Sequence, residues 1–452
     1  MKILHHRADQ ALATAEAVQS SLRPAETAAT FLERTARRRL VCDATGKKQL
    51  LIEDPAFSGF VRLERDGQEL YLNANQLTEP TAARLLATGR PLFRLGSPAV
   101  DGGQPHAHPR AQSADGCWHT TPDRLDMASA ALRTGELMAA IGAHLSPGQS
   151  VAGVHVSDIL RESVFLDSSE ARLQDQCYGV ELTAVVTDEA GTPMVSATRY
   201  ATALDDIDLA GLGRELSLIH TGMAAGERPF TGTLVVFAPS AVAQVLRALV
   251  NTILLNPITH PAPLATSLVD EGPRTVGCGA RSFDCEGTAT GATELVGRDG
   301  RQRTLATRKV VLAEGRPGER TPLTGHAWWN PLKNFPQMTA GNVRLLPTPD
   351  TTADALLDGE RCVIVDARTL GVEEFRSGGQ LAFRLLAART VDGVPQEACT
   401  PMSVEGSAID FLASVTAVGD TVSYFPGQIS AGGAYLEMDI SRITSKAMGS
   451  QP

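Results

Sequence analysis

The sequence predicts an α+β protein in which an N-terminal α+β domain precedes a mixed, β-rich C-terminal domain. Two observations predict this class: helical periodicity alternates with short β-branched runs through the first half, and strand patterns dominate from residue 229 onward. The chain has 452 residues, of which 43% are hydrophobic, so it is long enough for two or three domains with their own cores.

Residues 1–95 are expected to form the N-terminal α+β domain. The composition of residues 8–39 favours helix, with a restart at Pro24. The segment FVRLERDGQELYLN alternates apolar and polar residues about Asp66-Gly67, which predicts a β-hairpin. A further helix is expected near residues 80–88. The Gly- and Pro-rich residues 96–120 are interpreted as a linker.

Residues 121–228 are expected to form a central α/β domain. Thr121 is the expected cap of a first helix that stops by residues 146–148. The pattern then predicts two strands joined across residues 188–191 and a helix over residues 207–223.

Residues 229–452 are expected to form the β-rich C-terminal domain. It begins with a strand at 234–237 and a helix that Ser240 caps and Asn256 ends. A short helix is expected near 407–417. The other strands are expected in RCVIVDA, in GQLAFRLLAARTVDGVPQ with a turn at Asp392-Gly393, and in AYLEMDI.

Charge and hydropathy exclude several classes of partner. The net charge is −10 and no basic block is interleaved with aromatic residues, which argues against a nucleic-acid partner. The longest apolar run, within residues 241–255, is too short for the roughly 20 residues of a bilayer span, so no membrane partner is expected. The opening MKILHHRADQ lacks a signal-peptide pattern, and seven scattered cysteines predict reduced thiols. We therefore expect a cytoplasmic protein.

One cluster has the residue types of a zinc site. Its four competent ligands lie in QPHAHPRAQSADGCWH and are His106, His108, Cys117 and His119. Their spacing matches no common zinc ribbon or finger, and no predicted helix or strand fixes them. The alternative is a loop that binds no metal and faces solvent or a partner.

The segment GCGARSFDCEG offers a second candidate for chemistry. Cys278 and Cys285 lack a local base, so a catalytic thiol would need a distant histidine such as His326. The acidic residues of this segment are interpreted as a turn that hydrogen-bonds its own backbone, formed by Asp284, Glu286 and Gly287. No nucleophile elbow, Walker motif or dinucleotide fingerprint occurs.

Several stretches, in their order along the chain, resemble the TldD/PmbA (TldD/TldE) family of peptidase subunits. They are TLVVFAPSAVAQVLRALV, RSFDCEGT, LTGHA, MTAGNVRLLPTPDTTADALLDGERCVIVDARTLG, FLASVTAVGDTVSY and GGAYLEMDISRI. The resemblance covers the C-terminal half well, whereas the N-terminal and central units match only in pattern. It implies a TldD/PmbA-type C-terminal domain.

The resemblance also implies where a catalytic metal would be bound. In TldD-type subunits the helix after the first of these strands carries H-E-x-x-x-H, whose histidines bind zinc and whose glutamate activates water, and a later cysteine completes the site. Here the helix reads PSAVAQVLRALVN and the later segment SYFPGQISAGG, with no histidine, glutamate or cysteine. The chain therefore resembles the TldE (PmbA) branch, which implies no catalytic residue and no cofactor in this chain, with zinc in a TldD-like partner subunit.

A substrate or partner cleft is expected around GHAWWNPLKNFP. The residues chosen for its wall are Thr324, Gly325, His326, Trp328 and Trp329. For the two tryptophans the alternative is that they fill a core. The expected function is a non-catalytic subunit of a heterodimeric metallopeptidase that binds a peptide or an amide-bearing natural product. Two alternatives remain, a stand-alone hydrolase with relocated metal ligands and a non-enzymatic binding protein for a pathway intermediate.

Overall fold

The computed structural model describes residues 2–447 except 96, 99–123, 170, 193, 225, 227, 230–231, 260, 273–278, 308–322, 331–334, 371–378 and 428. Helices and strands are mixed along the chain, which confirms the predicted α+β class. None of the described helices is long and apolar enough to cross a membrane.

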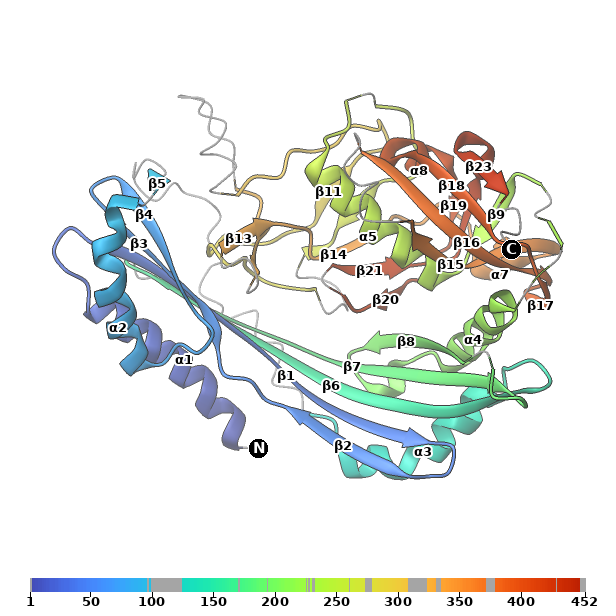
Figure 1. Cartoon of the computed structure of the whole chain (residues 1–452), viewed down its shortest axis with the longest axis horizontal. Coiled ribbons are helices and arrows are strands. Elements are labelled where there is room, and N and C mark those ends of the chain that lie inside the picture. Colours follow the sequence, from blue (N-terminus) through green and yellow to red (C-terminus); the bar gives the residue numbers. More distant parts are fainter. Residues whose placement is uncertain are drawn as a thin grey trace.

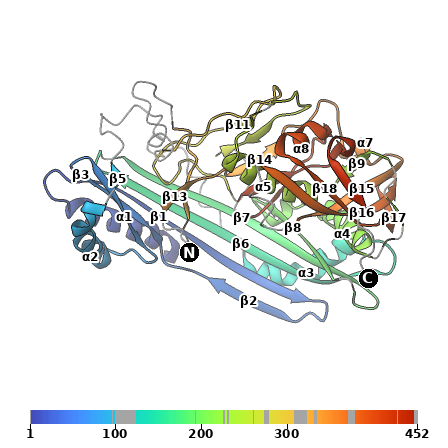
Figure 2. The same cartoon turned by 45° about the horizontal axis from the view of Figure 1, so that its top comes forward.

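The described chain forms a larger sheet of thirteen strands (Figure 1). These are β1 (Thr27–Asp43), β2 (Lys48–Glu53), β3 (Ser58–Arg65), β4 (Gln68–Ala74), β5 (Ser97–Pro98), β6 (Gln149–Asp167), β7 (Arg172–Asp188), β8 (Val195–Ala201), β10 (Leu268–Asp270), β11 (Thr293–Val296), β14 (Asn342–Leu345), β20 (Ser423–Phe425) and β21 (Ser430–Gly433). The order is β11-β10-β14-β21-β20-β8-β7-β6-β1-β3-β4-β5, with β2 paired to β1. The long antiparallel strands β1, β6 and β7 run beneath much of the molecule (Figure 2).

A smaller, eight-stranded sheet belongs to the C-terminal half. Its strands are β9 (Leu234–Phe237), β15 (Glu360–Thr369), β16 (Gln380–Val391), β17 (Val394–Ala398), β18 (Met402–Ser407), β19 (Val415–Val418), β22 (Leu436–Asp439) and β23 (Thr444–Ala447). A separate two-stranded sheet pairs β12 (Ala327–Asn330) with β13 (Phe335–Met338).

The described helices are α1 (Lys2–Ser20), α2 (Glu79–Gly89), α3 (Met127–Gly142), α4 (Leu209–Met223), α5 (Pro239–Leu255), α7 (Ala353–Leu357) and α8 (Ala408–Ser414). Helix α5 contacts β15 of the smaller sheet and β21 of the larger one. Its apolar residues, such as Val242, Leu246 and Ile253, are buried there in the largest apolar core. Helix α5 is therefore one buried element that joins the two sheets, and α4, which contacts β8 of the larger sheet and β16 of the smaller one, is another.

Most predicted elements are confirmed. The hairpin β3–β4 turns at Asp66 and Gly67, both of which have positive φ, as its two-residue turn requires. The β7–β8 and β16–β17 connections also lie where they were expected. Helices α2, α4, α5 and α8 match the predicted helices closely.

The predicted helical restart at Pro24 is wrong. Helix α1 ends at Ser20, and β1 begins at Thr27. The alanine, glutamate and arginine content of this segment favours helix, but β1 hydrogen-bonds to β6 on one side and to β2 and β3 on the other. Pairing on both edges outweighs a local helix propensity of a few tenths of a kcal/mol per residue.

Two helix caps also differ from their predicted residues. Ser240 lies inside α5, whose cap position is Ala238, and its backbone N–H donates 2.8 Å to the carboxylate of Glu215 on α4. A carboxylate from another helix thus satisfies the first turn of α5, where negative charge is favourable. Helix α3 begins at Met127 with Asp126 as its cap, and Thr121 lies outside the described residues.

The predicted division into domains stays a prediction. The larger sheet draws strands from the ranges 1–95, 121–228 and 229–452. The candidate site therefore rests on a sheet to which each of these ranges contributes. Most of the expected linker, 96–120, lies outside the described residues.

Candidate functional site

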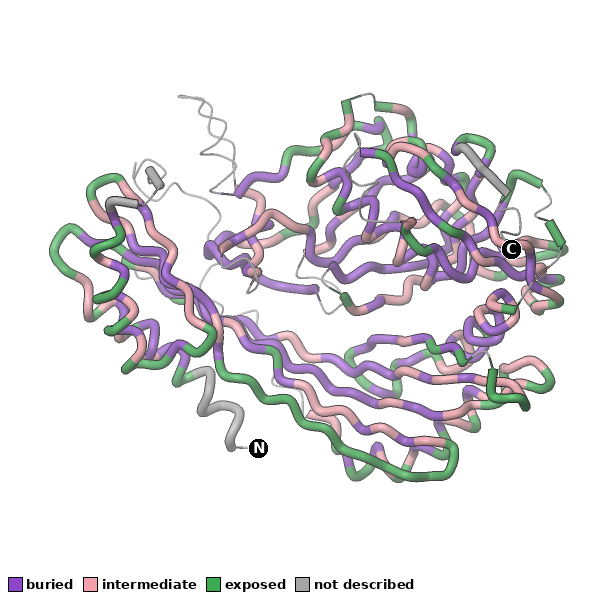
Figure 3. Tube along the Cα trace, in the orientation of Figure 1, coloured by how far each residue is buried: buried purple, intermediate pink, exposed green. Residues whose placement is uncertain are grey.

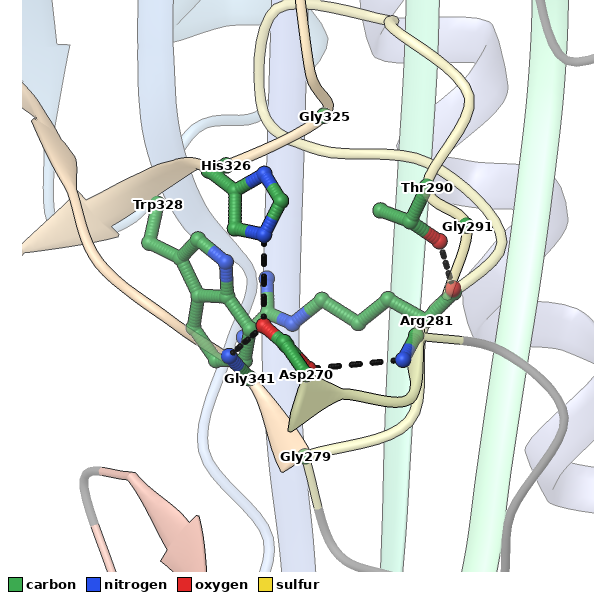
Figure 4. Close-up of a pocket in the computed structure, with 10 residues that line it drawn as sticks. Asp270, Gly279, Arg281, Thr290, Gly291, Gly325, His326, Trp328 and Gly341 are labelled. Carbon is green, nitrogen blue, oxygen red and sulfur yellow. Dashed lines mark hydrogen bonds and ion pairs between the residues drawn. The ribbon is translucent and has the colours of Figure 1, made fainter. Parts of the chain in front are cut away.

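A small pocket opens where loops of the C-terminal half meet above the long strands (Figure 4). Its cavity volume is only about 10 Å³, far below the roughly 300–1,000 Å³ of pockets that enclose a drug-sized ligand. Its lining includes Asp270, Arg281, Thr290, Gly325, His326, Trp328 and Gly341. The pocket has room for about one water molecule or one ligand atom rather than for a whole ligand.

Asp270 ends β10 at the floor of the pocket. Its carboxylate accepts hydrogen bonds from the backbone N–H groups of Gly341 (2.6 Å) and Asn342 (2.8 Å) and lies 3.4 Å from Nε2 of His326. Burial alone would raise the pKa of Asp270, but His326 and these two donors outweigh it and hold the pKa below its ordinary value. Asp270 is therefore an ionised anchor.

His326 is only 3% exposed and is held from both sides. Its Nε2 faces Asp270, and its Nδ1 lies 3.0 Å from Oγ1 of Thr324. That hydroxyl also accepts a 3.0 Å hydrogen bond from the backbone N–H of Ala306. Thr324 is therefore a support for the imidazole. Because both ring nitrogens face protein groups, His326 and Asp270 together form a fixed wall of the pocket.

Arg281 and Trp328 also line the pocket. The Arg281 guanidinium carbon lies 3.8 Å from the centre of the Trp328 ring, and Nη1 lies 2.9 Å from Oε2 of Glu33 on β1. Burial lowers the pKa of Arg281, although the Glu33 carboxylate opposes this shift. The ring and the carboxylate fix a buried cation beside the pocket.

The long sheet positions the loop that carries Arg281. Arg161 of β6 donates to the backbone carbonyl of Ala280, and the carboxylate of Asp175 on β7 accepts 3.0 Å from the N–H of Ser282. Thr290 closes the loop by donating to the carbonyl of Arg281. Residues from distant parts of the chain thus build one rigid wall.

The neighbouring segment FDCEG forms a turn around Asp284. Its carboxylate accepts hydrogen bonds from the N–H groups of Glu286 (2.9 Å), Thr288 (2.9 Å) and Ala327 (3.0 Å), and Gly287 has a φ of 79°. Burial and the nearby Glu286 raise the pKa of Asp284 to about 7. Because the third bond reaches Ala327, this turn holds the start of β12 beside the pocket.

Trp328 and Trp329 point to opposite sides, as neighbours on a strand do. Trp328 lines the pocket. Trp329 is 9% exposed, and its ring centre lies 5.3 Å from that of Phe60 on β3, within an apolar cluster that also contains Phe283. Trp329 thus packs in an apolar cluster and Trp328 lines the pocket, and the part of either residue in a substrate or partner cleft stays a prediction.

Residues 262–442 match the family model described as the PmbA/TldA metallopeptidase C-terminal domain. Residues 262–442 form a PmbA/TldD-type domain. The resemblance found in the sequence is thereby confirmed for this domain.

Several solved structures have a fold similar to that of nearly the whole chain. TldE from Thermococcus kodakarensis is 12% identical with a TM-score of 0.71, and the match covers 95% of this chain and 98% of that one. A protein described as a proposed modulator of a DNA gyrase from Thermotoga maritima MSB8 is 15% identical with a TM-score of 0.70, over 98% and 100%. A similarly described Bacteroides thetaiotaomicron VPI-5482 protein is 15% identical with a TM-score of 0.68, over 97% and 98%. These likenesses show a shared fold. No curated protein matches the chain.

The PmbA/TldD resemblance implies a zinc site between α5 and the segment 423–433, and the described residues there do not fit one. Gln244 hydrogen-bonds to Asp366 and to the N–H of Ala367 on β15. Arg247 donates to the backbone carbonyls of Phe425 (2.7 Å), Pro426 (2.8 Å) and Ile429 (3.0 Å). A guanidinium offers donors and no lone pair, so it cannot bind a cation. In this chain Arg247 bridges the helix and the segment.

No group of three or more potential metal ligands occurs among the described residues. The four zinc ligands considered from the sequence, His106, His108, Cys117 and His119, lie outside the described residues. Cys278 lies outside them as well. Cys285 is fully buried, and burial raises the pKa of its thiol well above the ordinary value, which disfavours the reactive thiolate.

Sequence reasoning missed Asp270 and Arg281. Asp270 ends the strand LVD before Glu271-Gly272, and an acidic residue between a short strand and a glycine could have been noted as a candidate. Arg281 begins the quoted RSFDCEG motif but gave no signal of its own. Asp270 reaches residues 326–328 only because β10 pairs with β14, a strand that lies far along the chain.

Proposed function

We propose that this chain is a TldE-like, non-catalytic subunit of a zinc-dependent heterodimeric peptidase. It would stabilise a TldD-like partner and form one wall of the chamber that binds a peptide or an amide-bearing natural product. The fold likeness and the PmbA/TldD-type domain support the class of assembly. The proposal that this chain is the non-catalytic subunit rests on its own residues.

The observation that carries the proposal is the bridge made by Arg247. The Arg247 side chain on α5 hydrogen-bonds to the backbone carbonyls of residues 425, 426 and 429. The resemblance implies metal ligands at this place. A zinc ion placed beside this guanidinium would meet a fixed positive charge, and the described neighbours provide no cluster of ligands to offset the repulsion. The catalytic zinc is therefore assigned to the partner subunit.

The pocket around His326 supports a part in substrate binding. The Arg281 cation lies beside the small space that His326 also lines, so the pocket is suited to a single carbonyl or carboxylate oxygen. The ring of Trp328 adds an apolar surface to this polar pair. Such a pocket would hold one group of an extended peptide while the partner's metal carries out cleavage.

The two alternatives make different predictions about metal and partner. A stand-alone hydrolase with relocated ligands would bind zinc through His106, His108, Cys117 and His119 without a second chain. A binding protein for a pathway intermediate would bind its ligand without a second chain and without zinc. Neither alternative has a described contact that favours it over the subunit proposal.

The test is reconstitution with a chain that carries H-E-x-x-x-H, sought first in the neighbouring reading frame. The two chains are purified separately and together, and zinc content and peptide cleavage are measured for each sample. We expect zinc in the partner, a stable complex, and cleavage by the complex alone. Stoichiometric zinc in the isolated chain would instead favour the stand-alone hydrolase, and failure to form any complex would favour the binding protein.

A further inference from the structure

The strand β2 is an uncovered edge of the larger sheet. In the described part of the chain it pairs with β1 alone, so its outer row of backbone N–H and C=O groups faces away from the sheet. All six of its residues are exposed, and Figure 3 shows them as a continuous exposed stretch along the sheet margin. Such an edge is a template for another strand.

The middle of β2 is apolar. Leu50, Leu51 and Ile52 are 47%, 40% and 65% exposed. Because successive side chains point to opposite faces, apolar surface is exposed on both faces of the strand. Natural edge strands are commonly protected by a central charge, a proline or a bulge, and KQLLIE has none of these between its ends. Burial of this edge against another strand would remove the exposed apolar surface from water.

The two ends of β2 carry opposite charges. Lys47 and Lys48 stand at its start, and Glu53 and Asp54 at its end. When two identical strands pair antiparallel, the basic start of each faces the acidic end of the other. The pattern is therefore complementary to itself, which favours a second copy over an unrelated strand.

Symmetry restricts the register of such a pair. In an antiparallel pair, two residues that lie directly opposite each other point their N–H and C=O groups either both toward the partner strand or both away from it. When a twofold axis perpendicular to the sheet relates two copies of one strand, this condition requires one residue to lie directly opposite its own copy. A pair centred on Leu50 places Lys47 opposite Glu53, and a pair centred on Leu51 places Lys48 opposite Asp54. Asp54 already binds Arg34 at 2.8 Å and Lys48 binds the carbonyl of Ala131. The register centred on Leu50 therefore uses the two charged residues that have no described ion pair.

We propose that β2 is a self-association surface, at which β2 of a second copy pairs antiparallel with the centre at Leu50. The larger sheets of the two copies then join into one. This surface is separate from the Arg247 bridge and from the His326 pocket, and the inference does not depend on the proposed function.

The test uses charge reversal in the full-length chain. Sedimentation velocity over a concentration series measures the dimer dissociation constant for the natural chain, Lys47→Glu and Glu53→Lys. Each variant alone sets like charges opposite each other twice, so we expect dimerisation to weaken by roughly tenfold or more. In an equimolar mixture both cross-strand pairs become complementary, and we expect a mixed dimer with the natural affinity.

Glu189→Lys is the matched control, because it changes an exposed glutamate on another loop by the same charge and should leave the dimer unchanged. Circular dichroism confirms that each variant is folded. A natural chain that stays monomeric at all concentrations overturns the proposal, as does a dimer that resists both reversals or a mixture that fails to associate. A monomer whose β2 reversals weaken only a complex with a metal-bearing subunit would assign this edge to that partner and also overturn it.

Discussion

The guanidinium of Arg247 donates a 3.0 Å hydrogen bond to the backbone carbonyl of Ile429. Two further bonds, to Phe425 and Pro426, make this side chain the link between α5 and the segment that leads into β21. The link accounts for a charged residue on a helix whose apolar face is buried in the core. It also fixes a positive charge where the family resemblance implies a metal.

Loss of this link is expected to destabilise the chain. Arg247→Ala removes three charge-assisted hydrogen bonds, and we expect a fall of about 2–4 kcal/mol in the free energy of unfolding. Arg247→Lys keeps the charge but not the fork of donors, so its loss should be intermediate. Chemical denaturation measures both. Arg442→Ala is the control, because Arg442 is 57% exposed in its side chain and donates to the carbonyl of Ala413; an equal loss in that variant would contradict the assigned role.

His326 is expected to act in substrate binding by the assembled complex. His326→Ala should lower kcat/KM by roughly tenfold without altering assembly, because the pocket wall that His326 and Asp270 form would lose its shape. Asp270→Asn should have a similar effect, and the double variant should add little because the two residues form one unit. Steady-state kinetics test this. His220→Ala, which removes another buried histidine bonded to Gln149, should leave kcat/KM unchanged, and unaltered kinetics in His326→Ala would remove this residue from the site.

The adjacent residues Trp328 and Trp329 are expected to differ in their effects on stability and on substrate binding. Trp329→Ala leaves a cavity beside Phe60 and is expected to cost about 3–5 kcal/mol of unfolding free energy. Trp328→Ala mainly removes the contact with Arg281 and is expected to cost about 1–2 kcal/mol, while raising KM of the complex. Denaturation and kinetics on both variants separate the two roles. Equal stability losses would refute the distinction drawn from the alternation of β12.

Local chemistry in the sequence was sufficient to predict the elements whose ends have strong signals. The hairpin at Asp66-Gly67 and the helix before Asn256 belong to this group. The strand β1 could not be predicted, because its helix-favouring composition is overridden by partners on both edges. For the site, Thr324, Gly325, His326 and Trp328 were chosen from their motif, whereas Asp270 joins them through sheet pairing, which leaves no local pattern.

Asp284 and Asp270 predict opposite dependences of stability on pH. Asp284 has a folded pKa of about 7 against an ordinary 3.8, so the folded state binds the proton more tightly, and stability falls as pH rises from about 4 to about 7. The pKa of Asp270 is lowered, so its contribution is present above about 4 and is lost as pH falls further.

Unfolding free energies measured from pH 4 to pH 8 test the contribution of Asp284. The decrease attributed to this residue should disappear in Asp284→Asn, even though the variant is less stable because the amide cannot accept all three N–H bonds. If the free energy of unfolding of this variant falls with pH as steeply as that of the natural chain, another group causes the decrease. In Asp270→Asn the free energy of unfolding should still fall between pH 4 and pH 8, because Asp270 titrates at lower pH.

Zinc analysis and peptide cleavage by the separately purified chain test whether the catalytic metal belongs to a partner subunit. We predict that the isolated protein holds no stoichiometric zinc and cleaves no peptide, and that both properties arise only when a subunit with H-E-x-x-x-H is added. Cleavage by the isolated chain that a chelator abolishes and zinc restores would contradict this assignment.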